Sequence, residues 1–289
     1  MGQRNKMKKP NEQESDQSDI SDSSIESDDE YSGNEVIQVE FEGRNPMTPD
    51  FHGVRQLLHQ LFLKSEINLS ELADTVTNQS FVGSVVIQSF PGDEDDEDSD
   101  DDLETIYGVT SAVDISRTRA TGCTEDIRKS LLSKCEQYAE QADKTAFKKI
   151  LDDDKNQVAI IINERFINIP AQISVPLLEN LHSEIQVAAM KNEKFRFSFY
   201  VMIMKFSRKK GNENPVDLLD DIYSNGEEEV LNEYADASFE YSVENETDST
   251  LSGKWSKKDS ALVPYRKVVV FDSAKFPVII NAIKELLNE

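Results

Sequence analysis

Cysteine, histidine and tryptophan are scarce, since this chain of 289 residues contains two, three and one of them, respectively. The two cysteines, Cys123 and Cys135, have neither metal-site spacing nor the number that a disulfide framework needs. No apolar run approaches the roughly 18–20 residues of a membrane span. The first ten residues lack the apolar core of a secretory signal, and Lys6 stands where a myristoylation motif has Ser or Thr. We therefore expect a reduced, soluble, intracellular protein.

Acidic side chains are abundant and unevenly placed, with 56 Asp and Glu against 31 Lys and Arg and a net charge of −25. Segments 12–30 and 93–102 carry nine acids each and segment 217–248 carries twelve, and none of the three contains Lys or Arg. The other 228 residues hold 31 basic and 26 acidic side chains, a balance of +5. The sequence therefore describes a slightly basic body with three acidic tracts.

These tracts restrict the class of partner. Clustered carboxylates repel a phosphate backbone, which argues against direct, high-affinity nucleic-acid binding through them. They suit basic protein partners, and the alternative is that they are solvated segments that serve solubility. We assign partner binding to Trp255 and to nine acids: Asp93, Glu94, Asp95, Asp96, Glu97, Asp98, Glu227, Glu228 and Glu229. For Trp255, packing as an anchor in the core is the competing interpretation.

Residues 1–34 are predicted to be a disordered acidic arm, and residues 35–289 a single domain with solvent-exposed acidic loops at 91–102 and 213–248. We expect strands at 35–42, 81–90, 103–113, 157–166, 195–206, 237–243 and 265–271. Helical periodicity covers Phe51–Phe62, Leu69–Val76, Ile127–Tyr138, Leu177–Ala188 and Phe276–Leu287, and Thr48, Asn68 and Thr124 are the expected N-caps. Interleaved strands and helices predict an α/β fold in which helices sandwich a mixed sheet.

The opening order of one strand, two helices and an antiparallel strand pair is similar to the acetyl-CoA-dependent N-acetyltransferase fold. Such enzymes hold the pyrophosphate on a Gln/Arg-x-x-Gly-x-Gly/Ala loop, and the nearest match here is 208–213, directly after a predicted strand. Glu213 puts a carboxylate where that loop has a small residue, so we expect no functional acetyl-CoA site. An acyltransferase that uses acetyl-CoA is kept as an alternative.

Other catalytic groups have no supporting pattern. His52, His59 and His182 form no metal-binding pair, and Cys123 precedes a predicted helix but has no His near it in sequence. We assign no catalytic residue, cofactor or metal, and we expect a protein that is not an enzyme.

Ser23, Ser27 and Ser99 each have an acid three residues on, the pattern that acidophilic kinases favour. Phosphate there adds roughly −1.5 to −2 charge apiece and deepens the tracts. We hypothesise phosphorylation at these serines, with chance matches in such runs as the alternative. Mass spectrometry that finds all three unmodified in protein from growing cells counts against it.

Several segments together resemble the BCCIP family, eukaryotic proteins named for interacting with the breast-cancer recombination mediator and a cyclin-dependent-kinase inhibitor. The order and spacing of the segments carry the resemblance, which covers essentially everything after about residue 35. Gly253–Trp255 is typical of the form with the ancestral C-terminus. The matching stretches are 78–86, 162–181, 197–205, 240–256 and 263–271.

The resemblance implies a non-enzymatic nuclear adaptor or chaperone with an acetyltransferase-like body that does not bind acetyl-CoA. It also implies roles in cell-cycle control, recombinational DNA repair, centrosome and spindle organisation, handling of a large-subunit ribosomal protein and, in fungi, nuclear export of a lipid kinase. The implied locations are the nucleus, with cytoplasmic and centrosome or spindle-pole pools. We expect a monomer. A histone-type acidic chaperone is a further alternative, which affinity purification separating ribosomal proteins from histones distinguishes.

Overall fold

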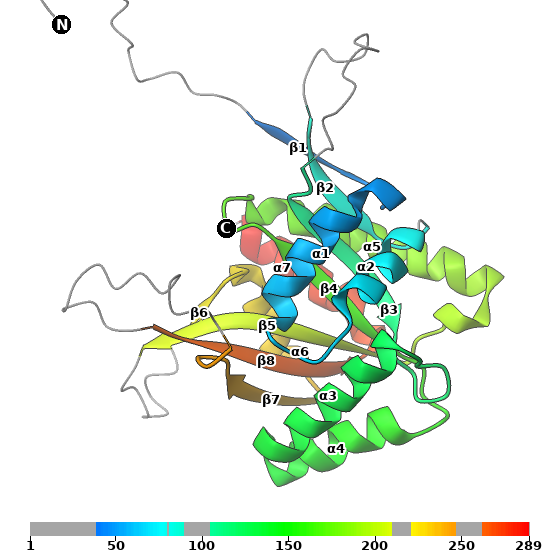
Figure 1. Ribbon diagram of the computed structural model, residues 1–289, viewed down its shortest axis with the longest axis vertical. Helices are drawn as coiled ribbons and strands as arrows, with labels where there is room; N and C mark the ends of the chain where they lie inside the picture. Colours follow the sequence, from blue (N-terminus) through cyan, green and yellow to red (C-terminus); the bar gives the residue numbers. More distant parts are fainter. Residues whose placement is uncertain (1–38, 80, 90–104, 210–220, 247–261, 289) are drawn as a thin grey trace, which may run out of the picture. The chain divides into compact units, whose positions relative to one another are not determined.

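The computed structural model describes residues 39–79, 81–89, 105–209, 221–246 and 262–288, within one compact unit that begins at Val39 (Figure 1). Its strands are β1 (Glu40–Arg44), β2 (Ser84–Ser89), β3 (Gly108–Asp114), β4 (Val158–Arg165), β5 (Phe199–Lys209), β6 (Ile222–Tyr223), β7 (Ala237–Ser242) and β8 (Leu262–Asp272). They form one eight-stranded sheet in the order β1-β2-β3-β4-β5-β8-β7, with β6 paired to β5 off this path. Only β4 and β5 pair in parallel among the described strands, so the sheet is mixed, as predicted.

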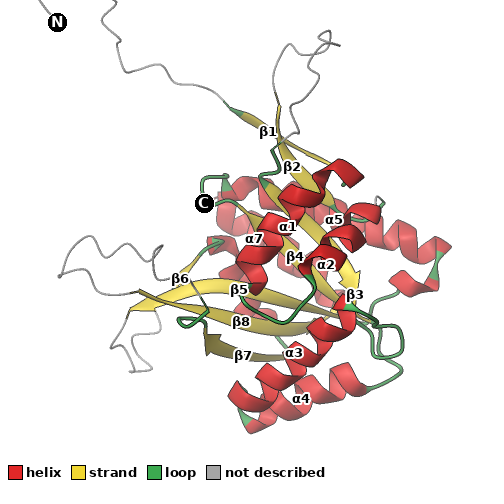
Figure 2. Cartoon of the chain, viewed as in Figure 1, coloured by secondary structure: helices red, strands yellow, loops and turns green. Residues whose placement is uncertain are grey.

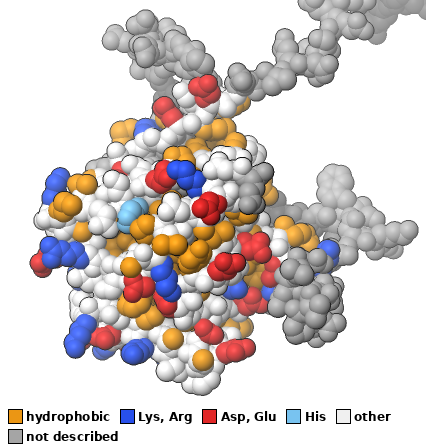
Figure 3. Space-filling model, turned by 180° about the vertical axis from the view of Figure 1, so that it is seen from behind, with side chains coloured by type: hydrophobic (Ala, Val, Ile, Leu, Met, Phe, Trp, Pro, Cys, Tyr) orange, Lys and Arg blue, Asp and Glu red, His pale blue; other side chains and the backbone are white. Residues whose placement is uncertain are grey.

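Helices cover both faces of this sheet (Figures 1 and 2). One face carries α1 (Phe51–Phe62), α2 (Leu69–Asn78), α3 (Cys123–Tyr138) and α4 (Gln141–Asp152). The other face carries α5 (Ser174–Lys191), the short α6 (Leu231–Tyr234) and α7 (Phe276–Asn288), and Figure 3 shows the molecule from this side. The predicted sandwich of helices around a mixed sheet is confirmed.

Alternation along the central strands explains why both faces are covered. In β4, Ile160 and Ile162 contribute to the core under α1–α4, whereas Ala159 and Ile161 contribute to the core under α5 and α7. Strands β5 and β8 alternate in the same way. Each fully buried aliphatic side chain stabilises the fold by roughly 1.5–3 kcal/mol. The continuous apolar runs at 157–166 and 195–206 are therefore buried central strands, as expected.

Two of the three expected helix caps are wrong. Asn68 does cap α2, because its side-chain oxygen accepts from the Glu71 backbone N–H at 3.3 Å. Thr48, however, lies inside a 3₁₀ turn that precedes α1. The Asp50 carboxylate caps the start of that turn by accepting from the Met47 N–H at 2.7 Å.

The start of α3 depends on a distant residue. The helix begins at Cys123 after Gly122, which has φ +53°, and the Thr124 hydroxyl bonds Thr121 instead of capping it. The Cys123 N–H donates to the carboxylate of Glu71 on α2 at 3.1 Å. A cap supplied by another helix leaves no local sequence signal, which is why Thr124 was the wrong choice.

The sequence patterns missed α4, β6 and α6. Helix α4 has few apolar residues, and its buried positions are Phe147, Ile150 and Leu151. These pack on β7, where the rings of Phe147 and Phe239 meet edge to face at 5.2 Å. Its helical conformation depends on this packing more than on a long apolar stripe.

Candidate functional site

Strands β4 and β5 separate after a short paired stretch. They pair only from Val158 with Phe199 to Ile161 with Met202, and beyond this point they diverge in Figure 1. Residues 222–230, which form β6 and a 3₁₀ helix at Gly226–Val230, lie beside the diverging strands. We call residues 222–230 the wedge.

Two buried ion pairs lie in this region. Arg165 at the end of β4 donates two hydrogen bonds to Glu227 of the wedge, at 2.5 and 2.9 Å, and the two side chains are 9% and 0% exposed. Lys205 of β5 pairs with Glu164 of β4 across the opening. Burial raises the pKa of the Glu164 carboxyl, and Lys205 opposes that effect. Removing one partner of such a pair costs about 3–5 kcal/mol.

Glu228 adds a third buried carboxyl to the wedge. Its Oε1 accepts from the side-chain amides of Asn163 at 2.9 Å and Asn225 at 2.8 Å. Burial first, and then the negative charges of Glu227 and Glu164, raise the pKa of Glu228 to about 8, although the two amide hydrogen bonds oppose this rise. This carboxyl is therefore mostly protonated at neutral pH and acts as a hydrogen-bonding group inside the fold.

The acidic loop expected at 213–248 is described only over residues 221–246, where β7 agrees with the strand expected at 237–243 and part of the remainder is buried. Residues 221–246 contain two strands and a helix, and Glu227 and Glu228 are only 1% and 2% exposed. Both carboxyls are hydrogen-bonded inside the fold, Glu227 to Arg165 and Glu228 to two asparagines, and their role in partner contacts stays a prediction. Glu229 is exposed, so its role in partner binding stays a prediction.

Arg208 occupies the first position of the loop compared with acetyl-CoA enzymes. Its guanidinium makes two hydrogen bonds of 2.8 Å to Asp221 and one of 2.8 Å to Glu240. It also lies over the Tyr265 ring, 4.9 Å from the centroid. The hydrogen bonds of Arg208 are therefore made to carboxylates of the same chain. The remaining loop residues 210–213 lie outside the described residues.

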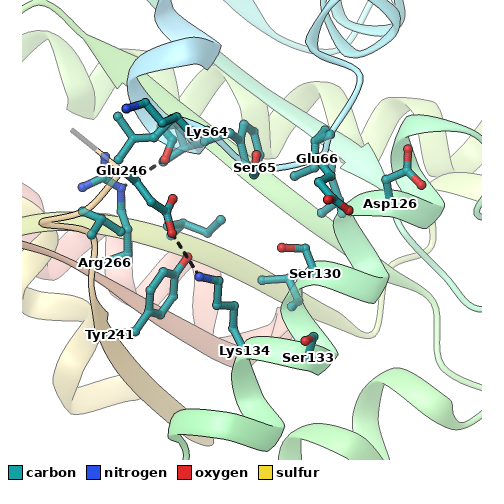
Figure 4. Close-up of a pocket in the computed structure, with 18 of the residues that line it drawn as sticks. Lys64, Ser65, Glu66, Asp126, Ser130, Ser133, Lys134, Tyr241, Glu246 and Arg266 are labelled. Carbon is teal, nitrogen blue, oxygen red and sulfur yellow. Dashed lines mark hydrogen bonds and ion pairs between the residues drawn. The ribbon is translucent and has the colours of Figure 1, made fainter. Parts of the chain in front are cut away.

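A separate pocket of about 410 Å³ lies on the face covered by α1–α4 (Figure 4). The α1–α2 connection, α3, and strands β5, β7 and β8 line it. Its apolar surface comes from buried side chains that include Leu61, Ile127, Leu131 and Ile203. A cavity of this size accommodates one or two side chains of a partner protein.

One end of the pocket is occupied by internal charge pairs (Figure 4). Lys134 Nζ lies 3.1 Å from Glu246 Oε1 and 4.6 Å from the centroid of the Tyr241 ring. Arg266, 6% exposed, donates to the Leu61 and Gln60 carbonyls in the last turn of α1, at 3.0 and 2.8 Å. Burial lowers its pKa. This arginine completes the helix end and is a structural group.

The other end of the pocket carries two open carboxylates, Glu66 and Asp126 (Figure 4). Neither carboxylate forms a hydrogen bond or an ion pair with another described residue. Long basic side chains place their stems on apolar surface while the charged head meets polar groups. Lys64 and Lys129 also line the pocket, and Lys129 lies 3.6 Å from Glu125. The two open carboxylates above the apolar floor are the groups with which a Lys or Arg side chain of a partner can pair.

The histidines and cysteines have no catalytic arrangement in the described residues. His52 and His59 are exposed on α1, and burial lowers the pKa of His182 on α5. Cys123 is 1% exposed, and burial followed by the charge of Glu71 raises its thiol pKa, so it is not a poised nucleophile. No group of three or more possible metal-ligating side chains occurs in the ranges described.

Several predicted sites lie outside the described residues: Asp93, Glu94, Asp95, Asp96, Glu97, Asp98, Ser23, Ser27, Ser99 and Trp255. Sequence reasoning missed the wedge, although the polar triplet 163–165 at the end of the apolar run in β4 was a usable signal. It also missed that Glu66 and Asp126 line the same pocket, because they come from different elements and leave no local pattern. Among the residues that the structure describes, no helix has the length and apolarity to cross a membrane.

Helices cover both faces of one mixed sheet, and the wedge is bonded to β4 through side chains and to β5 through β6. This arrangement defines a single-domain α/β protein. The crystal structure of BCP1 from Saccharomyces cerevisiae has a similar fold, with a TM-score of 0.50 and 23% identity over 90% of this chain and 93% of that chain. A family model described as BCCIP matches residues 36–257. This chain therefore belongs to the BCCIP family, which confirms the resemblance drawn from the sequence.

Curated relatives come from animals and plants. The protein BCCIP homolog of Drosophila melanogaster is 40% identical over 263 residues, 90% of this chain and 88% of the relative. The BRCA2 and CDKN1A-interacting protein of Mus musculus is 32% identical over 259 residues, 87% of this chain and 81% of the relative. The Arabidopsis thaliana homolog is 25% identical over 233 residues, 76% and 68% of the two chains.

Proposed function

We propose that the protein is a non-enzymatic adaptor or chaperone that binds basic segments of other proteins. The observation that carries the proposal is the pocket rim, where Glu66 and Asp126 lie unpaired among the described residues above an apolar floor. The acidic segments 12–30 and 93–102 extend the same preference in the sequence. A basic partner gains specific contacts in the pocket and long-range attraction from the tracts.

The partners we propose follow from the names of relatives. The mouse and human relatives are called BRCA2 and CDKN1A-interacting proteins, so we propose that this chain binds the counterparts of BRCA2 and CDKN1A. On this proposal the protein acts in the cell cycle and in DNA repair. Its proposed location is the nucleus, with cytoplasmic and centrosome or spindle-pole pools. Chaperoning of a basic large-subunit ribosomal protein fits the same charge pattern.

A binding experiment with neutralised rim acids tests the proposal. Purified full-length chain is titrated against a fluorescein-labelled basic fragment of the CDKN1A counterpart, and fluorescence anisotropy is followed at low and at physiological salt. The double variant Glu66→Gln/Asp126→Asn is expected to bind roughly 5- to 30-fold more weakly, because two ion pairs worth about 0.5–1 kcal/mol each are lost. A weaker salt dependence accompanies the loss.

The matched control removes the same charge elsewhere. Asp74→Asn/Glu233→Gln changes two exposed acids without hydrogen-bonded side-chain partners among the described residues and is expected to keep the affinity within about twofold. If both double variants weaken binding of the basic fragment equally, the effect is due to net charge, and the proposal that the pocket binds the fragment is overturned. A third variant with Ser and Asn in place of the acids at 93–102 measures the contribution of that tract. Unchanged affinity at low salt in all three variants overturns the proposal.

Calorimetry with acetyl-CoA tests the non-enzymatic part. We expect no heat of binding, because Arg208 is held by Asp221 and Glu240. Micromolar binding of acetyl-CoA overturns this part and restores the acyltransferase alternative. The variant Asp221→Asn/Glu240→Gln, which frees Arg208, provides a comparison in which any phosphate affinity is expected to rise.

A further inference from the structure

A second groove lies on the opposite side of the sheet, beside α5. It has a volume of about 390 Å³ and lies between the segment before β2, the C-terminal half of α5 and the 3₁₀ helix Glu193–Phe195. Because α5 belongs to the face away from α1–α4, this groove is separate from the pocket that contains Glu66 and Asp126.

The groove exposes large apolar side chains. Phe81 is 56% exposed and Val187 48% exposed, while Ala188 forms a buried part of the wall at 5%. The Phe81 ring meets Phe195 edge to face at 5.4 Å, and Phe195 continues into the core through Phe197. The two rings therefore form an anchored apolar wall that loses its contact with water only when another molecule covers it.

The carboxylate inside the groove is already committed to the chain. Glu184 accepts from the Gly83 N–H at 2.7 Å and from the side-chain amides of Asn45 and Asn180, both at 3.0 Å. Two of these donors come from the segments beside β1 and β2, and the third, Asn180, lies on α5 itself. Because its carboxylate already accepts these hydrogen bonds, Glu184 does not offer the groove an unpaired negative charge.

The rim itself is basic. Lys191 lines the groove and has no carboxylate partner among the described residues, and the same holds for the side chain of Lys194 in the next turn. Arg196 follows, paired with the exposed Glu193 at 3.3 Å. In Figure 3, Lys and Arg side chains gather with hydrophobic ones along the left edge of this face. Lys191 thus lines the groove, and the chain from 191 to 196 carries three cations and one acid.

We propose that this groove binds an acidic amphipathic segment of a partner protein, in which bulky apolar side chains alternate with Asp and Glu. The apolar side chain packs between Phe81 and Val187, and the flanking carboxylates pair with Lys191 and Lys194. This specificity is opposite in charge to that of the pocket at Glu66. The protein then has two recognition surfaces, on opposite faces of the sheet, for segments of opposite charge.

Fluorescence anisotropy with short peptides tests the proposal on the full-length chain. The probe is a fluorescein-labelled peptide of about 12 residues in which one Phe and two Leu side chains are separated by Asp and Glu. Two further peptides have Lys in place of the acids, or Ser in place of the apolar residues. We expect the acidic apolar peptide to bind at least about 10-fold more tightly than either of the others.

Single substitutions locate the site. Phe81→Ser is expected to weaken binding about 10-fold, whereas Ile167→Ser, at an apolar side chain that is 90% exposed elsewhere, leaves it unchanged. Lys191→Glu is expected to weaken the acidic peptide about 5-fold and to strengthen the Lys peptide. Lys149→Glu, at an exposed lysine of α4, is the charge-matched control and changes neither affinity by more than about twofold.

Four results overturn the proposal. The first is no binding of the acidic peptide, and the second is tighter binding of the Lys peptide. The third is equal loss of affinity in Lys191→Glu and Lys149→Glu, which assigns the effect to net charge. The fourth is a concentration-dependent dimer in analytical ultracentrifugation that Phe81→Ser abolishes, which makes a second copy the occupant. Circular dichroism of each variant confirms that the fold is retained.

Discussion

Replacing Glu228 by Gln is expected to stabilise the protein, and the gain is expected to grow as the pH rises. Glu228 is buried in the wedge, and its Oε1 accepts hydrogen bonds from Asn163 and Asn225. Its pKa is raised to about 8, first by burial and then by the charges of Glu227 and Glu164. Gln has the shape of the protonated carboxyl and keeps an oxygen for both amides, but it has no proton to lose.

The sign and size of the expected gain in unfolding free energy follow from proton linkage. The ordinary pKa of this group is 4.5, so between pH 4.5 and about 8 the unfolded chain has released a proton that the folded chain keeps. The corresponding stability is fully present below pH 4.5 and is lost as the pH rises through about 8. At about 1.36 kcal/mol per pKa unit, the wild-type chain loses about 1 kcal/mol by pH 5 and about 4 kcal/mol by pH 8. The Gln variant avoids this loss.

Urea unfolding of both proteins at pH 5, 6, 7 and 8 measures the difference in unfolding free energy. Titrations of groups distant from Glu228 are common to both proteins and cancel in this difference. The control is Glu229→Gln, an exposed neighbour, for which the difference is expected to stay within about 0.5 kcal/mol at every pH. A difference for Glu228→Gln that is constant with pH, or a variant that is less stable at pH 8, refutes the reasoning.

Three further predictions concern other parts of the fold. Arg165→Met is expected to lower the unfolding free energy in urea by about 3–5 kcal/mol, because it leaves Glu227 buried without its cation, and Arg165→Met/Glu227→Met is expected to recover most of the loss. Gly122→Ala is expected to lower the unfolding free energy by about 1–3 kcal/mol in the same assay, because Gly122 has φ +53° and an added Cβ collides with the Glu71 carboxylate. An unchanged unfolding free energy contradicts the described start of α3. Both cysteines are buried with raised thiol pKa values, so Ellman's reagent is expected to leave native protein unlabelled at neutral pH and to titrate two thiols in urea.

The helices and central strands were predictable because their signals are local. Apolar residues repeat at helical spacing along α1, and the uninterrupted apolar runs in β4 and β5 predict that both faces of each strand are buried. Asn68 before α2 was readable as a cap for the same reason. By contrast, the cap of α3 comes from Glu71 on another helix, and the apolar positions of α4 are explained only by β7.

The same distinction applies to the candidate sites. Clustering of acids showed where negative charge lies along the chain, but not which acids reach solvent. Glu227 and Glu228 are adjacent to the exposed Glu229, yet they are buried because Arg165, Asn163 and Asn225 are within hydrogen-bonding distance. A carboxyl enters the interior only where partners offset its lost hydration, and two of these partners, Asn163 and Arg165, are more than 60 residues away in sequence.

The sequence by itself determined the alternation of strands and helices, the α/β class and the charge imbalance, and its segments identified the BCCIP family. Each of these depends on composition or on spacing within a few residues. The tertiary structure alone decided which carboxylates are structural and which are available, because exposure depends on neighbours that folding brings together. It shows that Glu227 and Glu228 are buried, that Glu66 and Asp126 line a pocket on one face, and that an apolar groove with Lys191 lies on the opposite face.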